Sequence, residues 1–280
     1  MLNIIIDTLI ESVKITLFVL VMMIAVDLIN VWSKGKFALL LDSAGKWKQY
    51  LVTSAVGTVP GCMGAFANVS LYMHGMISFG ALAGSMIATS GDEAFVMLVM
   101  FPKTAVILFI VLFFIGLFSS KVIDSVVKKL KIETCTDCEV KQYHKDERSF
   151  KHYLKEHVWG HIIKHHLWKT LLWTFGALIF IEAGKQYWNF GEISHQYTFL
   201  VLVISALIGL IPESGPNLVF VTMFATGVIP FSVLLTNSIV QDGHGLLPML
   251  SYSVKDSIKI KLFNLIIGVT LGTILFAFGL

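Results

Sequence analysis

Apolar stretches of nearly membrane-spanning length run through the chain and are separated by short polar breaks. The longest stretches lie at 12–32, 103–119, 163–181, 197–212 and 257–280. Each of them approaches the roughly 20 residues that an α-helix needs to cross a bilayer. The pattern therefore predicts an all-α, polytopic membrane protein.

The chain repeats its own pattern after 152 residues. Sliding the sequence by this distance aligns Gly57 with Gly209 and Pro60 with Pro212. Three further pairs align in the same way: Gly75 with Gly227, Gly91 with Gly243, and Lys103 with Lys255. Proline and glycine are costly in a helix interior, so their recurrence at matched positions indicates a duplicated unit. Duplication of this kind is a common construction among membrane transporters.

Each half combines full helices with shorter apolar pieces. The predicted full helices are 12–32, 103–119, 163–183 and 257–278. The predicted breaks fall at 59–64, 90–93, 211–216 and 241–245. Pieces such as 49–58 and 94–101 are too short to span alone, and irregular backbone at membrane depth must be buried in protein or line a wet cavity. We therefore expect two repeats of about five membrane segments each, with broken or re-entrant helices.

The distribution of charged residues along the chain indicates how it is divided into domains. Of all residues, 56% are hydrophobic and 14% are charged, against about 25% charged in soluble domains. Eleven of the 21 Lys and Arg residues lie between residues 121 and 169, and Lys-rich loops face the cytoplasm. We expect a first transmembrane repeat at 1–119, a cytoplasmic Cys/His-rich basic loop at 120–162 and a second transmembrane repeat at 163–280.

Lysine counts also predict how the two repeats are related. If each half crosses the membrane an odd number of times, the inner loops hold 18 basic residues and leave only Lys14, Lys103 and Lys185 outside. This asymmetry favours an inverted repeat in a cytoplasmic membrane. The first helix is expected to be retained, because the N-terminus lacks the basic region and cleavage site of a signal peptide.

Acidic side chains occur in the broken segments without a basic residue close by in sequence. The windows 49–102 and 186–254 contain no Lys or Arg but hold Asp92, Glu93, Glu192, Glu213 and Asp242. An unpaired acid at the centre of a membrane costs about 2.5–3.5 kcal/mol, so a bound cation or a proton is the expected partner. The alternative is that the breaks are short loops at the membrane surface, where acids cost little.

The candidate metal ligands are the polar side chains at these breaks: Cys62, Asn68, Ser90, Asp92, Glu93, Glu213, Asn217, Asn237, Gln241 and Asp242. His244 is a further candidate beside the last break. Asp27 and Glu182 near the ends of the first helix of each half are also candidates, although an interfacial position explains them slightly better. Broken helices add free backbone carbonyls, which coordinate cations.

The central loop offers a second set of ligands in ETCTDCEVKQYHKDERSFKHYLKEHVWGHIIKHH (133–166). Cys135 and Cys138 are expected to remain reduced in the cytoplasm. His157, His161 and His165 recur every four residues and would form one stripe of a helix. The loop is either a metal-capturing segment or a basic amphipathic helix lying on anionic lipid.

The break sequences resemble a known family. GTVPGC (57–62), ATSGDEA (88–94), GLIPESGP (209–216) and SIVQDGHGLLP (238–248) are similar to the ten-helix heavy-metal exporters of prokaryotes. Members of that family are labelled arsenic efflux permeases or manganese transporters. The resemblance implies metal export across the cytoplasmic membrane, with the motif positions occupied here by Cys62, Asp92, Glu93, Glu213 and Asp242.

The donor types favour a hard or borderline cation over arsenite. The predicted transport core offers one thiol against at least four carboxylates, and the second half carries Glu213-Ser214 where the first carries Gly61-Cys62. Carboxylates and amides suit Mn²⁺, whereas thiolates select soft metals. We therefore expect Mn²⁺ as the transported ion, with arsenite or a soft metal as the alternative.

The expected mechanism is alternating access, with protons as the candidate coupling ion. The chain has no phosphate-binding loop, so no use of ATP is expected. The lipid bilayer and the metal are the expected partners, with no nucleic acid and no resident cofactor, and the oligomeric state is open.

Two enzyme hypotheses are weaker than transport. The spacing of HIIKHH (161–166) fits a membrane di-iron enzyme, but His74, His195 and His244 are isolated in the sequence. An intramembrane protease using Asp92 and Asp242 lacks a recognisable substrate groove. We therefore expect a protein that is not an enzyme.

Overall fold

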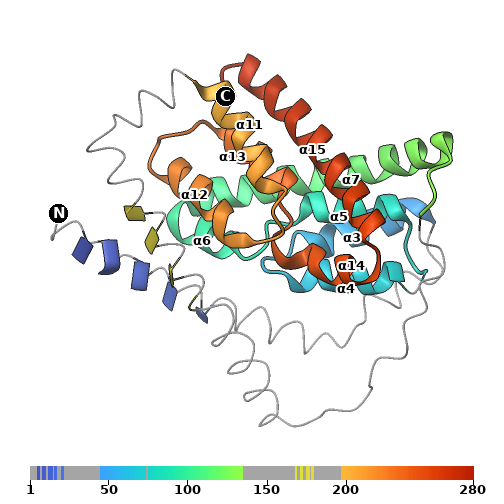
Figure 1. Cartoon of the computed structure of the whole chain (residues 1–280), viewed down its shortest axis with the longest axis horizontal. Helices are drawn as coiled ribbons and strands as arrows, with labels where there is room; N and C mark the ends of the chain where they lie inside the picture. The colour runs from blue at the N-terminus through green and yellow to red at the C-terminus, as the bar shows by residue number, and fades with distance from the viewer. Residues whose placement is uncertain are drawn as a thin grey trace, which may run out of the picture.

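A computed structural model describes residues 45–73, 75–134 and 197–280, with single positions between 5 and 21 and between 168 and 179. Every regular element in these ranges is helical, and no strand occurs among the described residues (Figure 1). The predicted all-α fold is confirmed. The predicted first helix of each half lies largely outside the described residues.

Five helices of the first half have described bounds, and the described positions between 5 and 21 are helical as well. The five helices are α3 (Lys46–Gly57), α4 (Met63–Met73), α5 (Phe79–Ala88), α6 (Glu93–Met100) and α7 (Pro102–Leu130). The hydroxyl of Ser78 caps α5 by accepting a hydrogen bond from the backbone N–H of Ala81. Pro102 opens α7, where the missing backbone N–H is harmless.

The second half repeats these elements 152 residues later. Its helices are α11 (Thr198–Gly209), α12 (Ser214–Ala225), α13 (Phe231–Val240), η2 (Gly243–Leu246), α14 (Leu247–Tyr252) and α15 (Val254–Ala277). Adding 152 to the bounds of α3 and α5 gives the bounds of α11 and α13. The helix pattern of the two halves is therefore the same, as the sequence repeat predicts.

The helix breaks also match between the halves. The chain leaves the α-helical conformation at 58–62 and 89–92, and again at 210–213 and 241–246, where 243–246 form the 3-10 helix η2; all four lie within or beside the predicted breaks. The last helix of the first half, predicted over 103–119, extends to Leu130. Ile123 is buried and Val127 packs against the core, so the apolar periodicity of α7 continues into the basic region.

Helix α5 lies at the centre of the described bundle, and all of its residues are buried. It packs against α3 and α7 in its own half and against α13 and α15 in the other. Gly84 of α5 faces Ser120 of α7, and 152 residues later Thr236 of α13 faces Gly272 of α15. One partner in each pair is glycine, because an added Cβ would collide with the hydroxyl oxygen of Ser120 or Thr236. This close approach is typical of helices packed in a membrane.

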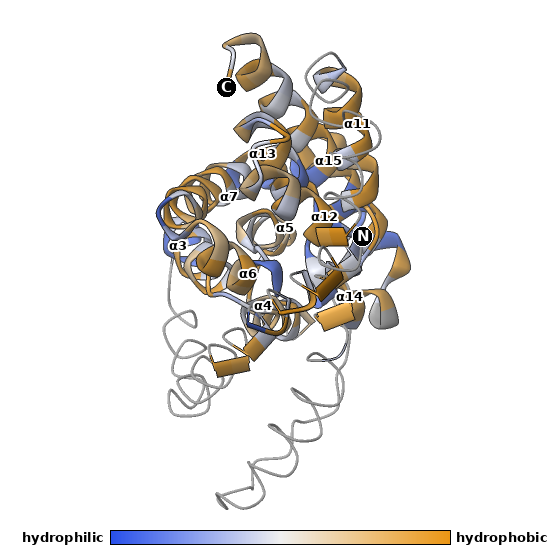
Figure 2. Ribbon diagram, turned by 90° about the vertical axis from the view of Figure 1, so that its left-hand side faces the viewer, coloured by the Kyte–Doolittle hydropathy of each residue, from blue (hydrophilic) through white to orange (hydrophobic). Residues whose placement is uncertain are grey.

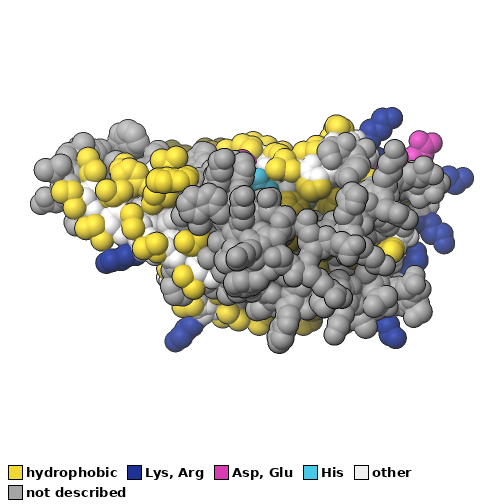
Figure 3. Space-filling view, turned by 90° about the horizontal axis from the view of Figure 1, so that it is seen from below, with side chains coloured by type: hydrophobic (Ala, Val, Ile, Leu, Met, Phe, Trp, Pro, Cys, Tyr) yellow, Lys and Arg dark blue, Asp and Glu magenta, His cyan; other side chains and the backbone are white. Residues whose placement is uncertain are grey.

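Three helical segments are long and apolar enough to cross a membrane: Phe79–Met100, Pro102–Leu130 and Val254–Ala277. Most of the helical ribbon is apolar (Figure 2). Exposed apolar side chains recur every three or four residues along α7, at Ile107, Ile110, Phe114, Phe118 and Val122. Apolar side chains cover much of the described surface in Figure 3, and basic side chains project at its margins. This surface suits contact with lipid.

Candidate metal centre

Two helix breaks, one from each half, cross in the interior. The first joins α5 to α6 and the second joins α13 to η2. Their glycines, Gly91 and Gly243, have φ angles of 55° and 50°. A Cβ added to either glycine would lie 3.4 Å from the Cα of the other. Only glycine allows both this conformation and this contact without strain, so the crossing brings the polar residues of both breaks together.

A third break, at 58–62, is tied to the same crossing. The backbone N–H of Gly61 donates a hydrogen bond to the carbonyl oxygen of Gly91 at 3.0 Å. Gly61 has a φ of 94°, and the next residue is Cys62. The thiol of Cys62 then donates to Oδ1 of Asp92, with an Sγ–Oδ1 distance of 3.4 Å. The proline–glycine–cysteine sequence thus delivers a buried thiol to the acidic break.

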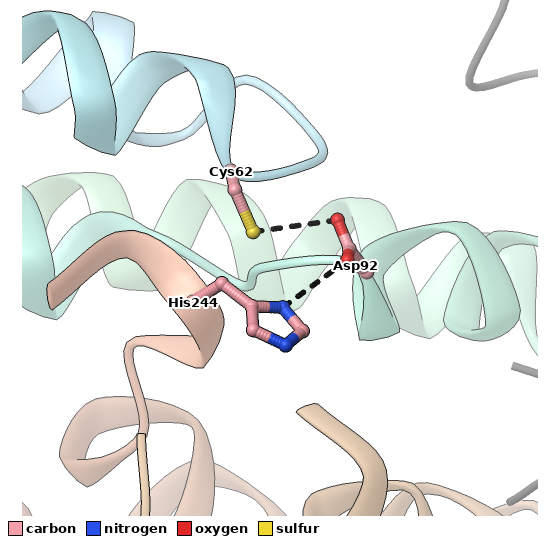
Figure 4. Close-up of side chains that lie close together, drawn as sticks. All are labelled: Cys62, Asp92 and His244. Carbon is pink, nitrogen blue, oxygen red and sulfur yellow. Dashed lines mark hydrogen bonds and ion pairs between the residues drawn. The ribbon is translucent and has the colours of Figure 1, made fainter. Parts of the chain in front are cut away.

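Cys62, Asp92 and His244 form a cluster of three potential metal ligands (Figure 4). One donor atom from each lies within 4.8 Å of the others. Nδ1 of His244 is 3.6 Å from Oδ2 of Asp92. Bonds of about 2.0–2.3 Å in a tetrahedral site separate their donor atoms by roughly 3.3–3.8 Å. The Cys62 thiol approaches Oδ1 of Asp92 and the His244 ring approaches Oδ2, so the three side chains would have to draw together from within 4.8 Å to hold one divalent cation.

Glu213 extends the cluster on the other side of the imidazole. Its Oε1 lies 2.9 Å from Nε2 of His244. A carboxylate on one ring nitrogen fixes the orientation of a metal-binding histidine and makes the other nitrogen a better ligand. Here that other nitrogen is Nδ1, which faces Asp92. Glu213 therefore lies where it can orient His244 toward the cation.

Asp242 forms an ion pair with a lysine that is distant in the sequence. Nζ of Lys261, on α15, lies 2.6 Å from Oδ1 of Asp242. The same ammonium group donates to the carbonyl oxygens of Gly209 at 2.9 Å and Val240 at 3.2 Å, at the ends of α11 and α13. Lys261 lies outside the Lys- and Arg-free window around Asp242, so the charges close by in sequence do not indicate this pair. Asp242 pairs with the chain's own cation and is not a member of the three-ligand cluster.

Glu93 is buried beside the crossing and is 1% exposed. Neither of its carboxylate oxygens has a hydrogen-bond partner. Ser214 is also buried without a partner for its hydroxyl, and the same holds for the side-chain nitrogen of Gln241. Buried polar atoms without a hydrogen-bond partner therefore lie next to the three-ligand cluster.

The three asparagine candidates of the described region form hydrogen bonds within the protein, whereas the hydroxyl of Ser90 does not. Nδ2 of Asn237 donates to Oδ1 of Asn217 at 2.9 Å and to the carbonyl oxygen of Ser205 at 3.0 Å. Nδ2 of Asn68 donates to the carbonyl oxygen of Thr53 at 2.9 Å. Ser90 is buried, and its hydroxyl has no partner. The amides thus join neighbouring helices around the crossing.

Several predicted ligands lie outside the described residues: Asp27, Glu182, Cys135, Cys138, His157, His161 and His165. Among the described ones, the structure brings Cys62, Asp92 and His244 together. His244 was only a secondary candidate in the sequence, although the repeat aligns it with Asp92. Lys261 was missed, because it lies 19 residues beyond Asp242 in an apolar helix and no local pattern pairs the two.

The chain matches a protein family described as "Putative, 10TM heavy-metal exporter". The matched residues are 1–189 and 172–278, nearly the whole chain. No curated protein and no solved structure matches it. The match agrees with the apolar spanning helices and with the resemblance in the four break sequences. The chain is a multi-pass membrane protein and belongs to the ten-transmembrane family of heavy-metal exporters.

Proposed function

We propose that this protein exports a divalent transition-metal cation across the cytoplasmic membrane and binds it through Cys62, Asp92 and His244. The observation that carries the proposal is the convergence of a thiol, a carboxylate and an imidazole within 4.8 Å at a buried crossing of helix breaks. Such donors in a membrane interior are costly unless they serve an ion path. The outward direction rests on the family description, and the cytoplasmic central loop rests on the lysine distribution.

The donor set bears on which metal is carried. The sequence-based preference for Mn²⁺ rested on at least four carboxylates, but Asp242 pairs with Lys261 and Glu213 with His244. The cluster itself then offers one sulfur, one nitrogen and one carboxylate. This combination suits Zn²⁺ or Cd²⁺ better than Mn²⁺, which prefers oxygen ligands. We therefore place Zn²⁺ and Cd²⁺ ahead of Mn²⁺, and arsenite last, because the cluster contains a single thiol.

Alternating access is supported by how the ligands divide between the halves. Cys62 and Asp92 come from the first half, whereas His244 and its partner Glu213 come from the second. A rocking motion of one half against the other would separate these two pairs and release the ion. Inverted repeats with a site between broken helices move in this way in other transporters. Metal binding to the thiol and imidazole also displaces protons, which gives a route for proton exchange.

The test is a measurement of cell-associated metal under challenge with Zn²⁺, Cd²⁺, Mn²⁺ or arsenite. Cells expressing the wild type are compared with cells expressing Cys62→Ser or His244→Asn at matched membrane levels. Ser85→Ala is the control, because Ser85 is buried and its hydroxyl bonds only to the carbonyl of Leu82 within its own helix. We expect the wild type and the control to lower Zn²⁺ and Cd²⁺, and the two cluster variants to lower neither.

Two other results would change the proposal. If the wild type lowers Mn²⁺ alone, the carboxylates outweigh the thiol and the sequence-based metal assignment stands. If it lowers arsenite and no divalent metal, the three-ligand cluster is not the transport site.

A further inference from the structure

The polar residues at the crossing divide into two chemically different groups. Cys62 and His244 bring sulfur and nitrogen to one group. The other group offers the side-chain oxygens of Glu93, Ser214 and Gln241, together with the amide nitrogen of Gln241, and it lies around the contact between the two break glycines.

The oxygens of the second group lie next to the two break glycines. A Cβ on Gly91 would lie 2.6 Å from Oε2 of Glu93 and 3.6 Å from Oε1 of Gln241. A Cβ on Gly243 would lie 2.9 Å from Oγ of Ser214 and 3.8 Å from the same Gln241 oxygen. All three side-chain oxygens therefore lie close to the contact between the two glycines.

Glu93 differs from the other buried acids in its surroundings. Asp92 lies against the His244 imidazole, Asp242 against Lys261, and Asp256 against Lys259 and the Tyr72 hydroxyl. Of the buried acids in the described ranges, Glu93 alone has no ion pair and no hydrogen bond of ordinary geometry at its carboxylate oxygens, and its polar neighbours are the Ser214 hydroxyl and the Asn217 amide. Burying a carboxylate without a counter-charge is strongly unfavourable, so Glu93 requires either a proton or a bound cation.

The charge of the group selects a monovalent, hard cation. The group carries one formal negative charge, so a divalent ion would leave an excess positive charge in a buried site. Helices α5 and α13 end at the crossing with partial negative charge, whereas α6 and α12 begin there, at Glu93 and Ser214, with partial positive charge, so the helix ends largely offset each other. In broken-helix transporters the C-terminal helix ends and nearby carbonyls coordinate Na⁺.

We propose that Glu93, Ser214 and Gln241 form a second, all-oxygen cation site that binds Na⁺ beside the Cys62–Asp92–His244 cluster. Na⁺ would balance the charge of the buried Glu93, and Oε1 of Gln241 is held near it by the backbone N–H of Gly243 at 2.8 Å. Its use as a coupling ion for metal export rests on the proposed function, but binding of Na⁺ does not.

The experiment is a Na⁺ titration of the purified full-length protein in lipid nanodiscs, with no transition metal present. The thermal unfolding midpoint is measured at constant ionic strength with choline as the replacing cation. We expect a saturable rise with Na⁺, since a ligand that binds only the folded state stabilises it. Equal midpoints in Na⁺, K⁺ and choline would overturn the proposal.

Variants localise the effect. Glu93→Gln removes the charge at constant shape and should weaken Na⁺ binding by about tenfold or more, since loss of one charge pair exceeds 1.4 kcal/mol. Ser214→Ala should weaken it less, and the buried Ser85→Ala should leave it unchanged. An unaltered Na⁺ response in Glu93→Gln would overturn the proposal, as would stabilisation of the wild type by acid alone and not by Na⁺.

A Zn²⁺ titration of the same samples separates this inference from the proposed function. We expect Cys62→Ser to lose Zn²⁺ binding and keep the Na⁺ response. If no sample binds Zn²⁺ while the Na⁺ response persists, the all-oxygen site stands and the metal proposal fails. If Cys62→Ser abolishes the Na⁺ response as well, the two groups are one site and the inference fails.

Discussion

Asp92 and His244 occupy equivalent positions of the two halves, 152 residues apart, and meet with an Oδ2–Nδ1 distance of 3.6 Å. A contact between equivalent positions places the three-ligand cluster where the halves face each other. Ligands contributed by both halves respond to any movement between them. This relationship makes the cluster sensitive to changes in either half.

Glu213→Gln should weaken metal binding although it leaves the three-ligand cluster intact. The carboxylate bonds to Nε2 of His244, and loss of such a partner lowers metal affinity by about 10–100-fold. Competition with a chromophoric Zn²⁺ chelator measures the affinity. Glu133→Gln, at an exposed position, is the control and should bind as the wild type does. An unchanged affinity in Glu213→Gln would show that Glu213 does not orient the imidazole.

Lys261→Met should destabilise the protein by about 3–5 kcal/mol, because it leaves Asp242 buried without its cation. Adding Asp242→Asn should recover most of the loss, since the uncompensated charge is then gone. Unfolding in a denaturing detergent titration measures the free energy. Lys255→Met, at an exposed position of the same helix, should change it by less than about 0.5 kcal/mol. A mild effect of Lys261→Met that Asp242→Asn does not reverse would contradict the ion pair.

Gly272→Ala should destabilise the contact between α13 and α15 by about 1–3 kcal/mol, because the new methyl group collides with Oγ1 of Thr236. The same unfolding measurement applies. Thr236→Gly combined with Gly272→Ser recreates the Gly84–Ser120 pair of the first half and should be more stable than Gly272→Ala. If the double variant is the least stable, the two packing contacts are not equivalent.

Metal binding should weaken as the pH falls. A thiol and an imidazole must lose their protons before they bind a cation, so each proton released on binding lowers the affinity about tenfold per unit of pH in the range where that group is protonated. Calorimetry in two buffers of different ionisation enthalpy counts the protons released. Cys62→Ser should release fewer protons than the wild type. Binding that does not change with pH would exclude the thiol as a ligand.

The helices and their breaks could be predicted from the sequence because they depend on local patterns. Apolar runs and the Pro and Gly positions are read directly, and the duplication gives each element a second, independent copy. The extension of α7 to Leu130 was missed, because Lys and Asp residues in 120–130 hide the buried positions at Ile123 and Val127. The inverted relation of the halves stays a prediction.

The site was less predictable, because pairing depends on which helices pack together. In the sequence, Cys62, Asp92 and Asp242 are all polar residues near helix breaks, and nothing there distinguishes the two cluster members from the third residue. Only the packing of α15 against α11 and α13 brings Lys261 to Asp242 and separates that acid from the cluster. The alignment of Asp92 with His244 was present in the repeat, but it indicates a meeting point only once the two breaks are known to cross.

The meeting of Asp92 with His244 has a consequence for a symmetric homodimer of two identical halves. Such a dimer would bring two copies of one residue together at this point, either two carboxylates that repel each other or two imidazoles without a counter-charge. Joining the halves in one chain lets each position carry a different residue. The fused chain can therefore place a carboxylate opposite an imidazole, with a single thiol beside them. A symmetric homodimer could not form this mixed set of donors.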